Sequence, residues 1–301
     1  MSSHHHSHNL NERNLRISVV LNLAIAVAEV VGGIIANSLS LLSDALHNLS
    51  DGLALLMAYV AHRFGKKNPT YSKTFGYKRI EILSAFLNSV ILVGVSIYLF
   101  VEAAERFFDP RPINGVVMLA VATIGLLANL ISVLILQRDS KHNLNIRAAY
   151  LHLIGDTLSS VAVIAGGLLI YFYEIYWVDP LVTIIIGVYI LKEAYGILKE
   201  AFEILMQGTP KQLDLEEIQH EIEALKQVHN LHHVHTWALN EKEIHFEAHV
   251  DLKEDLRISQ TDSLQEKIES ILKSHFGIAH TTLQFEHNAC REKELVKNHK
   301  R

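Results

Sequence analysis

Cysteine is almost absent from this chain of 301 residues, which contains a single one, Cys290. One thiol cannot form a disulfide framework, and zinc modules built from two or four cysteines are excluded as well. An excess of positive charge is also missing, because 27 Lys and Arg stand against 32 Asp and Glu, for a formal net charge of −5. We therefore expect no basic surface for nucleic acid.

Two enzyme signatures are missing too. Intramembrane zinc proteases use His-Glu-x-x-His, and a near match, His245-Phe-Glu-Ala-His249, has its glutamate one place off and lies in a predicted strand. No P-loop occurs, which argues against a pump driven by ATP. The chain is therefore not predicted to be an enzyme.

Hydrophobic residues, in contrast, make up 50% of the chain, and the mean hydropathy is +0.20. A helix needs about 20 mostly apolar residues to cross a bilayer. Runs of this kind lie at 17–36, 39–61, 80–100, 115–136, 148–171 and 178–198. A soluble helical bundle would need polar faces, which the third, fourth and fifth runs lack. We therefore predict an α-helical membrane protein in which residues 13–207 form six transmembrane helices.

The positive charges of the short loops predict the orientation. Lys and Arg gather before the first run and in the loops after the second and fourth runs, whereas the loops after the first and fifth runs have none. Positive loops stay on the cytoplasmic side, so both termini are predicted to be cytoplasmic. Residues 1–12 contain a His- and Ser-rich tract in place of a signal peptide, and we interpret them as a flexible tail, either native or an expression tag.

Residues 208–301 have a different composition. They hold 12 Lys and Arg against 17 Asp and Glu, and 11 of the 19 histidines. The hydrophobic pattern predicts helices at 214–227 and 259–276 and strands at 231–239, 243–251 and 281–286. Alternation along the second strand places His245, Glu247, His249 and Asp251 on one face and the apolar residues between them on the core face. This α-β-β-α-β order is typical of a small two-layer α+β, ferredoxin-like domain. An acidic, His-rich cytoplasmic domain favours binding of cations over anions.

Ionisable residues inside apolar spans cost about 2.5–3.5 kcal/mol each and need an explanation. His47 and Asp51 are four residues apart in the second span, as are His152 and Asp156 in the fifth. Residues at i and i+4 share a helix face, so each helix presents an imidazole beside a carboxylate. Facing one another, the pairs form a His₂Asp₂ set that suits tetrahedral Zn²⁺. Unrelated ion pairs or a proton relay would be the alternatives.

Three other polar residues lie in the spans. Asp44, three residues before His47, either orients an imidazole or marks the mouth of the helix. Glu29 and Asn129 are candidates for lining a water path, and for Asn129 hydrogen bonding between helices is the other interpretation.

The motifs Ser40-Leu-Leu-Ser-Asp-Ala-Leu-His-Asn-Leu-Ser-Asp51, Phe75-Gly-Tyr-Lys-Arg-Ile-Glu-Ile-Leu83 and His152-Leu-Ile-Gly-Asp156 resemble those of the cation diffusion facilitator family, specifically its bacterial zinc and cadmium exporters. The resemblance covers nearly everything after residue 12. It implies a homodimer in the bacterial inner membrane that exports Zn²⁺, and in some members Cd²⁺, in exchange for protons. On that pattern His47, Asp51, His152 and Asp156 match the transport site.

The resemblance also implies a cytoplasmic metal site. His235, His249 and Glu286 match its positions, with Trp237 in the accompanying His-x-Trp motif. Further candidates in this domain are His232, His233, His280 and His287. Metal bound there would tighten the dimer of 208–301 domains, so Zn²⁺ is expected both as substrate and as a regulatory ligand. No organic cofactor is implied.

Exchange is chemically reasonable for the paired residues. Zn²⁺ binds neutral imidazole and ionised carboxylate, so protons compete with the metal for the same atoms. Two readings remain open beside zinc export. The first is export of another transition metal such as Co²⁺, Ni²⁺, Fe²⁺ or Mn²⁺, and the second is a membrane-anchored metal sensor, which would not explain ligands in the middle of two spans.

Overall fold

A computed structural model describes residues 20, 23–65, 68–137, 144–240, 243–289 and 294–296. The predicted His-rich tail lies outside these residues. The chain divides into two compact units, one running up to Val60 and from Ser84 to Leu198, the other comprising Ala61–Leu83 and the residues from Lys199 onward. Each unit is described separately below.

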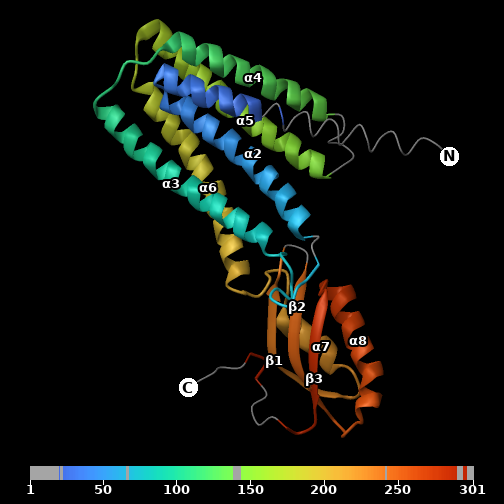
Figure 1. The fold of residues 1–301 in the computed structure, drawn as a ribbon. Helices are drawn as coiled ribbons and strands as arrows, with labels where there is room; N and C mark the ends of the chain where they lie inside the picture. The colour runs from blue at the N-terminus through green and yellow to red at the C-terminus, as the bar shows by residue number, and fades with distance from the viewer. Residues whose placement is uncertain are drawn as a thin grey trace, which may run out of the picture. The chain divides into compact units, whose positions relative to one another are not determined.

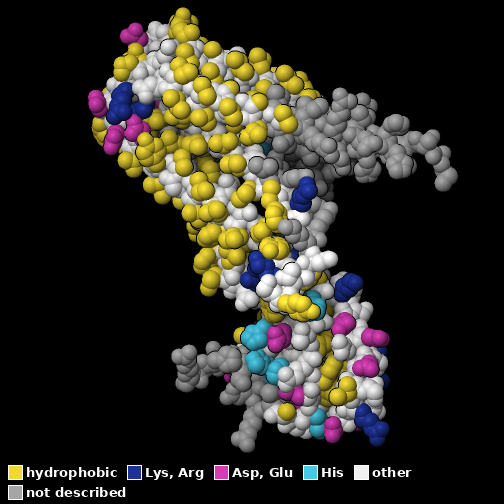
Figure 2. All heavy atoms as spheres, viewed as in Figure 1, with side chains coloured by type: hydrophobic (Ala, Val, Ile, Leu, Met, Phe, Trp, Pro, Cys, Tyr) yellow, Lys and Arg dark blue, Asp and Glu magenta, His cyan; other side chains and the backbone are white. Residues whose placement is uncertain are grey.

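The first unit is built from long helices that run side by side (Figure 1). They are the helix Leu23–Ala36, α2 (Leu39–Gly65), α3 (Ile80–Phe108), α4 (Gly115–Gln137), α5 (Leu144–Tyr173) and α6 (Val178–Leu205), of which α2, α3 and α6 extend into the second unit. Large apolar side chains cover much of their outer surface (Figure 2). A surface of this kind matches lipid and would be unstable in water.

Four of the six predicted spans are confirmed as helices long and apolar enough to cross a membrane, namely α3, α4, α6 and the Tyr150–Tyr173 part of α5. The helix Leu23–Ala36 is apolar but shorter. The 27-residue α2 has sufficient length, but it carries polar residues such as Asp44, His47 and Asp51 that lower its hydropathy. These two predicted spans are thus helical, but over the described residues neither is both long enough and apolar enough to count as a membrane span.

Glycine brings the helix Leu23–Ala36 and α4 close together. A Cβ atom on Gly32 would lie 2.6 Å from a methyl group of Val121, and one on Gly125 would lie 2.5 Å from Oε1 of Glu29. Small residues of this kind allow close helix packing in membranes.

Asp179, in the first turn of α6, fastens the start of α2. It is fully buried, and its oxygens accept hydrogen bonds from the backbone N–H groups of Leu39 and Ser40 at 2.7 and 3.1 Å and from the hydroxyls of Ser38 and Ser40 at 2.6 Å each. The first N–H groups of a helix have no partner within the helix, so this carboxylate satisfies donors that would otherwise be orphaned. The end of α2 next to Leu39 is therefore fixed to α6.

The second unit contains the predicted α-β-β-α-β order, which is confirmed: α7 (Leu215–Glu223), β1 (Val228–Ala238), β2 (Ile244–Leu252), α8 (Ile258–Phe276) and β3 (His280–Glu286). The strands form one sheet in the order β1-β2-β3, antiparallel between β1 and β2 and parallel between β2 and β3. Asp214 caps α7 by accepting hydrogen bonds from two backbone N–H groups.

The sheet has an apolar and a polar face. Phe246, Ala248 and Val250 of β2 are buried in a core that also contains Ile218 of α7 and Leu264 of α8. The intervening residues of β2 lie on the opposite face because side chains alternate along a strand, as the sequence predicted. This polar face holds His245, Glu247, His249 and Asp251.

Candidate metal sites

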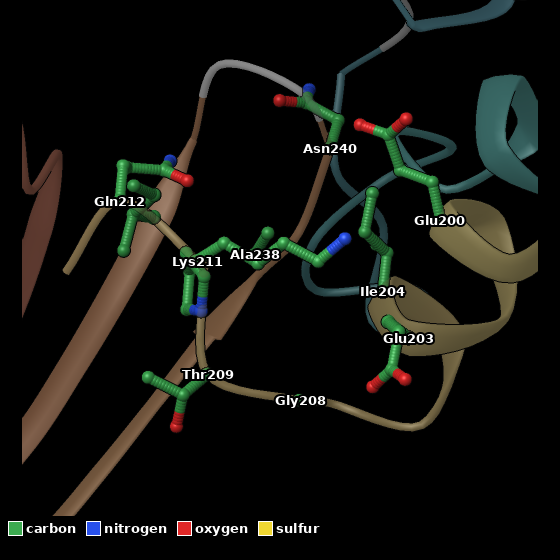
Figure 3. Close-up of a pocket in the computed structure, with 11 residues that line it drawn as sticks. Glu200, Glu203, Ile204, Gly208, Thr209, Lys211, Gln212, Ala238 and Asn240 are labelled. Carbon is green, nitrogen blue, oxygen red and sulfur yellow. The ribbon is translucent and has the colours of Figure 1, made fainter. Parts of the chain in front are cut away.

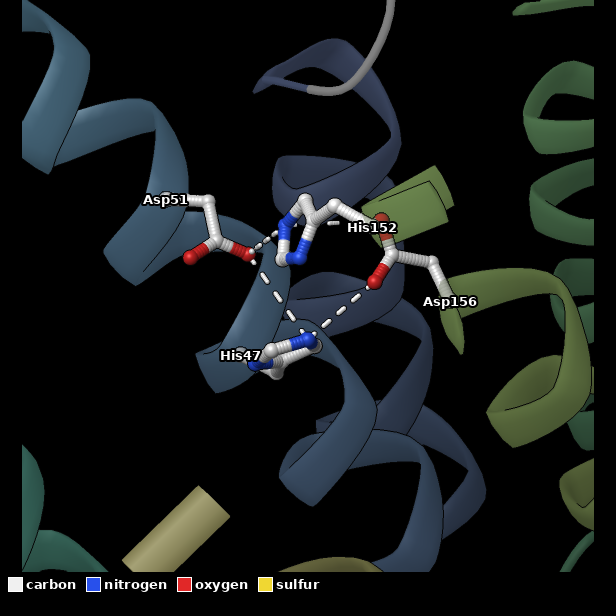
Figure 4. Close-up of side chains that lie close together, drawn as sticks. All are labelled: His47, Asp51, His152 and Asp156. Carbon is white, nitrogen blue, oxygen red and sulfur yellow. Dashed lines mark hydrogen bonds and ion pairs between the residues drawn. The ribbon is translucent and has the colours of Figure 1, made fainter. Parts of the chain in front are cut away.

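The two predicted His–Asp pairs lie together in the first unit (Figure 4). His47 and Asp51 lie on α2, and His152 and Asp156 on α5. One potential ligand atom from each of the four residues lies within 4.8 Å of the others. The i,i+4 spacing places each pair on one helix face, and the two faces meet.

The two shortest contacts cross from one helix to the other. His47 Nε2 is 3.1 Å from Asp156 Oδ1 and 3.7 Å from Asp51 Oδ2. His152 Nε2 is 3.0 Å from Asp51 Oδ2 and 3.8 Å from Asp156 Oδ2. Ligand atoms at tetrahedral positions about 2.05 Å from Zn²⁺ would lie about 3.3 Å apart, within the range of these four distances.

Burial is uneven across the cluster. The side chains of His47 and Asp156 are only 5% and 1% exposed, whereas those of Asp51 and His152 are 26% and 34% exposed. Asp156 Oδ2 is buried and has no hydrogen-bond partner among the described residues. A buried carboxylate oxygen without a donor is costly unless a cation or proton joins it. Two carboxylates and one divalent ion sum to zero charge, so a metal would remove that cost.

Asp44 lies outside this four-residue set. Its carboxylate accepts hydrogen bonds from the hydroxyls of Ser159 and Ser160 on α5, and Ser159 also donates to the carbonyl oxygen of Asp156 at 2.9 Å. Asp44 thus joins α2 to α5 beside the cluster through serine hydroxyls.

Tyr189 of α6 is a neighbour of the cluster that the sequence analysis missed. Its ring lies 5.8 Å from the ring of His47 in an edge-to-face arrangement, and its hydroxyl donates a hydrogen bond to Glu193. A tyrosine in an apolar span is common, so its position alone gives no signal. The signal that the sequence did offer was Glu193, an ionisable residue four positions later in the same helix.

A second group of potential ligands lies on the sheet of the second unit and consists of His232, His249 and Glu286. His232 Nε2 is 2.9 Å from Glu286 Oε1, and His249 Nδ1 is 3.4 Å from Glu286 Oε2. Burial lowers the pKa of His232 below its usual 6.5, although Glu286 acts in the opposite direction. A neutral imidazole is the form that binds a metal.

This group contains His249 and Glu286 of the predicted set, but it has His232 where the prediction has His235. The reason is a bulge in β1: His233 has a positive φ of 52°, and the pairing shifts between His232, opposite His249, and His235, opposite Glu247. His232 is buried, whereas His235 is exposed and has its ring 5.1 Å from that of His233. A bulge of one residue has no clear signature in the sequence.

The second unit also contains a pocket of about 250 Å³ where the end of α6 meets the segment that follows it (Figure 3). Glu200 and Glu203 of α6 line it together with Lys211 and Asn240. None of the predicted metal ligands is among its lining residues.

Comparison with known proteins agrees with this arrangement. Residues 15–206 match the cation efflux transmembrane domain, and residues 210–288 match the cytoplasmic domain of cation efflux proteins.

The chain is 39% identical over 288 residues to the cadmium, cobalt and zinc/H(+)-K(+) antiporter of Bacillus subtilis (strain 168), covering 95% of this chain and 92% of the relative. It is 37% identical to the zinc transporter ZitB of Escherichia coli (strain K12), covering 96% of this chain and 94% of the relative. It is 36% identical to the metal cation efflux system protein CzcD of Cupriavidus metallidurans, covering 99% and 94%. The chain therefore belongs to the cation efflux family of membrane transporters.

Proposed function

We propose that this protein exports Zn²⁺ from the cytoplasm in exchange for protons, with His47, Asp51, His152 and Asp156 as the transport site. The observation that carries the proposal is the meeting of these four side chains from α2 and α5, with one ligand atom of each within 4.8 Å of the others. The names of the relatives, which include a zinc transporter and an antiporter of cadmium, cobalt and zinc, support the choice of cargo.

The ligand set explains how exchange would proceed. Zn²⁺ requires deprotonated carboxylates and neutral imidazoles, so its binding releases protons and protonation of the same atoms releases the metal. A lower pH outside the cell would favour release there, and metal in the cytoplasm would favour binding inside. Rocking of helices around a site within the membrane would give alternating access.

The distribution of Lys and Arg supports an orientation with both termini in the cytoplasm. The match of residues 210–288 to a cytoplasmic domain agrees with it. The membrane is the bacterial inner membrane, as befits relatives from bacteria.

Two imidazoles and two carboxylates suit Zn²⁺ and also Cd²⁺ and Co²⁺, whereas Mg²⁺ prefers oxygen ligands alone. We therefore place Zn²⁺ first and Cd²⁺ second. Competition experiments in which Cd²⁺, Co²⁺, Ni²⁺ or Mn²⁺ reduce zinc flux would rank them.

Transport of ⁶⁵Zn²⁺ into proteoliposomes, with and without a pH gradient, tests the proposal. The wild type is expected to transport zinc and to depend on the gradient, whereas Asp51→Asn and Asp156→Asn lose a ligand and should lose transport. Asp109→Asn is the matched control, because Asp109 is an exposed carboxylate in the loop after α3. A wild type without flux would favour a metal sensor, and flux that ignores the gradient would exclude proton exchange.

We also propose that His232, His249 and Glu286 bind a regulatory Zn²⁺ and that the protein works as a homodimer. The short distances within this group and the lowered pKa of His232 support metal binding. Metal would join β1, β2 and β3 on the polar face of the sheet and rigidify the surface presented to a second copy.

A further inference from the structure

Glu29 is a buried carboxylate to which the proposed site gives no role. It lies in the helix Leu23–Ala36 and is 0% exposed. Oε2 accepts one hydrogen bond from Asn48 at 2.8 Å. Within the described part of the chain, Oε1 has no hydrogen-bond partner. A permanent buried anion with one donor is costly, and so is a permanent acid whose hydroxyl lacks an acceptor.

Among the described residues no Lys or Arg forms an ion pair with Glu29, and the one basic group that acts on it, His47, belongs to the metal cluster. The charged or titratable groups that act on it most are Asp44 and His47 on α2 and Asp156 on α5. From α4 the approaching residue is Gly125, and Asn129, one turn further along, is fully buried with neither side-chain polar atom hydrogen-bonded among the described residues. The nearby carboxylates repel the charged form of Glu29.

Asp44 makes an informative contrast. Both of its oxygens accept a hydrogen bond from a serine hydroxyl, and these two hydrogen bonds favour the carboxylate form. Only one oxygen of Glu29, Oε2, accepts a hydrogen bond among the described residues. Glu29 thus has one oxygen that a proton could occupy without displacing a donor, whereas both oxygens of Asp44 are already hydrogen-bonded.

Glu29 is also linked to the cluster by a single intermediate. Its partner Asn48 directly follows His47 on α2. When a divalent ion displaces fewer than two protons from its ligands, its arrival adds positive charge near Glu29, which favours loss of a proton from the carboxyl group. Departure of the ion reverses this effect.

We propose that Glu29 carries one proton of the exchange: its carboxylic acid releases H⁺ to become a carboxylate when the metal binds at the four-residue cluster, and it takes up H⁺ again when the metal leaves. The inference rests on the proposed metal–proton exchange and adds a proton site that is not a ligand. Protons displaced from the ligands themselves come in addition to this one.

Counting protons released on zinc binding tests the proposal. The detergent-solubilised protein is titrated with ZnCl₂ in weak buffer, with zinc affinity measured in parallel. Glu29→Gln keeps an acceptor for Asn48 and cannot titrate, so it should release about one proton fewer per zinc than the wild type. Glu29→Asp should restore the missing proton. Asn129→Ala, a buried neighbour that does not titrate, should leave the count unchanged.

A measurement on the wild type keeps the test decisive if Glu29→Gln does not fold. Infrared difference spectra of protein labelled with ¹³C-glutamate should show a protonated glutamic acid band that disappears on zinc binding. A Glu29→Gln variant that binds zinc and releases as many protons as the wild type would overturn the proposal, as would the absence of that band. Loss of gradient-dependent transport in the wild type would instead contradict the exchange itself.

Discussion

At the scale of single residues, the number of hydrogen-bond donors separates the buried carboxylates of the helical unit. Asp179 and Asp44 have donors on both oxygens, whereas Asp156 and Glu29 each have one oxygen without a hydrogen-bond partner among the described residues. The hydrogen bonds of the first two join helices together. The other two need a cation or a proton to complete their surroundings, which is what a metal–proton exchanger requires.

His245 on the polar face of the sheet provides a prediction about pH. Burial lowers its pKa below the usual 6.5, and His280 acts in the same direction. The folded state therefore favours the neutral ring. The contribution of His245 to the free energy of unfolding is fully present above pH 6.5 and is lost as the pH falls below that value. His245→Gln should make the unfolding temperature depend less on pH across this range. An NMR titration of the His245 ring checks the direction, and a pKa above 6.5 would contradict it.

At the scale of elements, close contact between the helix Leu23–Ala36 and α4 depends on glycine. Gly125→Ala would place a Cβ atom 2.5 Å from Glu29 Oε1, so the helices or the carboxylate must shift. We expect a loss of about 1–3 kcal/mol in stability, seen as a lower melting temperature in detergent.

Gly94→Ala in α3 is the matched control for this substitution, because a Cβ atom there has no neighbour within 4 Å. It should be neutral or slightly stabilising, since Ala favours helix over Gly by about 1 kcal/mol. Equal effects of the two substitutions would show that the contact with Glu29 is unimportant.

The hydrogen bonds that join Asp179 of α6 to the start of α2 give another prediction. Asp179→Asn replaces one acceptor oxygen by an amide donor that faces the donors of Ser38, Leu39 and Ser40. A buried donor without a partner costs about 1–3 kcal/mol, so the melting temperature should fall clearly. The same substitution at exposed Asp109 should change it little, and similar values for both variants would refute a structural role for Asp179.

The sequence predicted those features that follow from periodicity. The spacing of four in His47–Asp51 and in His152–Asp156 predicted one face on each helix, and alternation along β2 predicted its polar face correctly. Contacts between residues far apart in the sequence could not be predicted, because they depend on how the helices pack. Examples are the contact of Asp179 with the start of α2 and that of Tyr189 with His47. The resemblance implied His235 for the second cluster, but His232 lies there because of a bulge in β1, which a strict alternation of side chains along the strand does not predict.

At the scale of the whole molecule, each of the two units holds its own group of potential ligands: two helices form the first, and three strands form the second. The first group is formed by two separate helices, so a change in their packing would separate its ligands, as release of a transported ion requires. The second group is fixed on one sheet and is suited to retaining a metal.

The second group leads to a prediction about assembly. In an Asp51→Asn/Asp156→Asn background, which removes the membrane site, zinc should shift the full-length protein in detergent towards the dimer, as measured by sedimentation. His232→Ala and Glu286→Gln should weaken the effect of zinc, whereas His235→Ala should retain it. Loss of the effect in His235→Ala alone would show that the ligand set predicted from the sequence is the correct one.

Because Asp179 holds the start of α2 through hydrogen bonds, a tilt of this helix would pivot near Leu39. At a rise of 1.5 Å per residue, His47 lies about 12 Å from that point along the axis and Asp51 about 18 Å. Any tilt of α2 about its fixed end moves Asp51 half as far again as His47. Asp51, the α2 ligand that would move farther, is also the more exposed of the two, whereas the buried contact between His47 and Asp156 would be disturbed less.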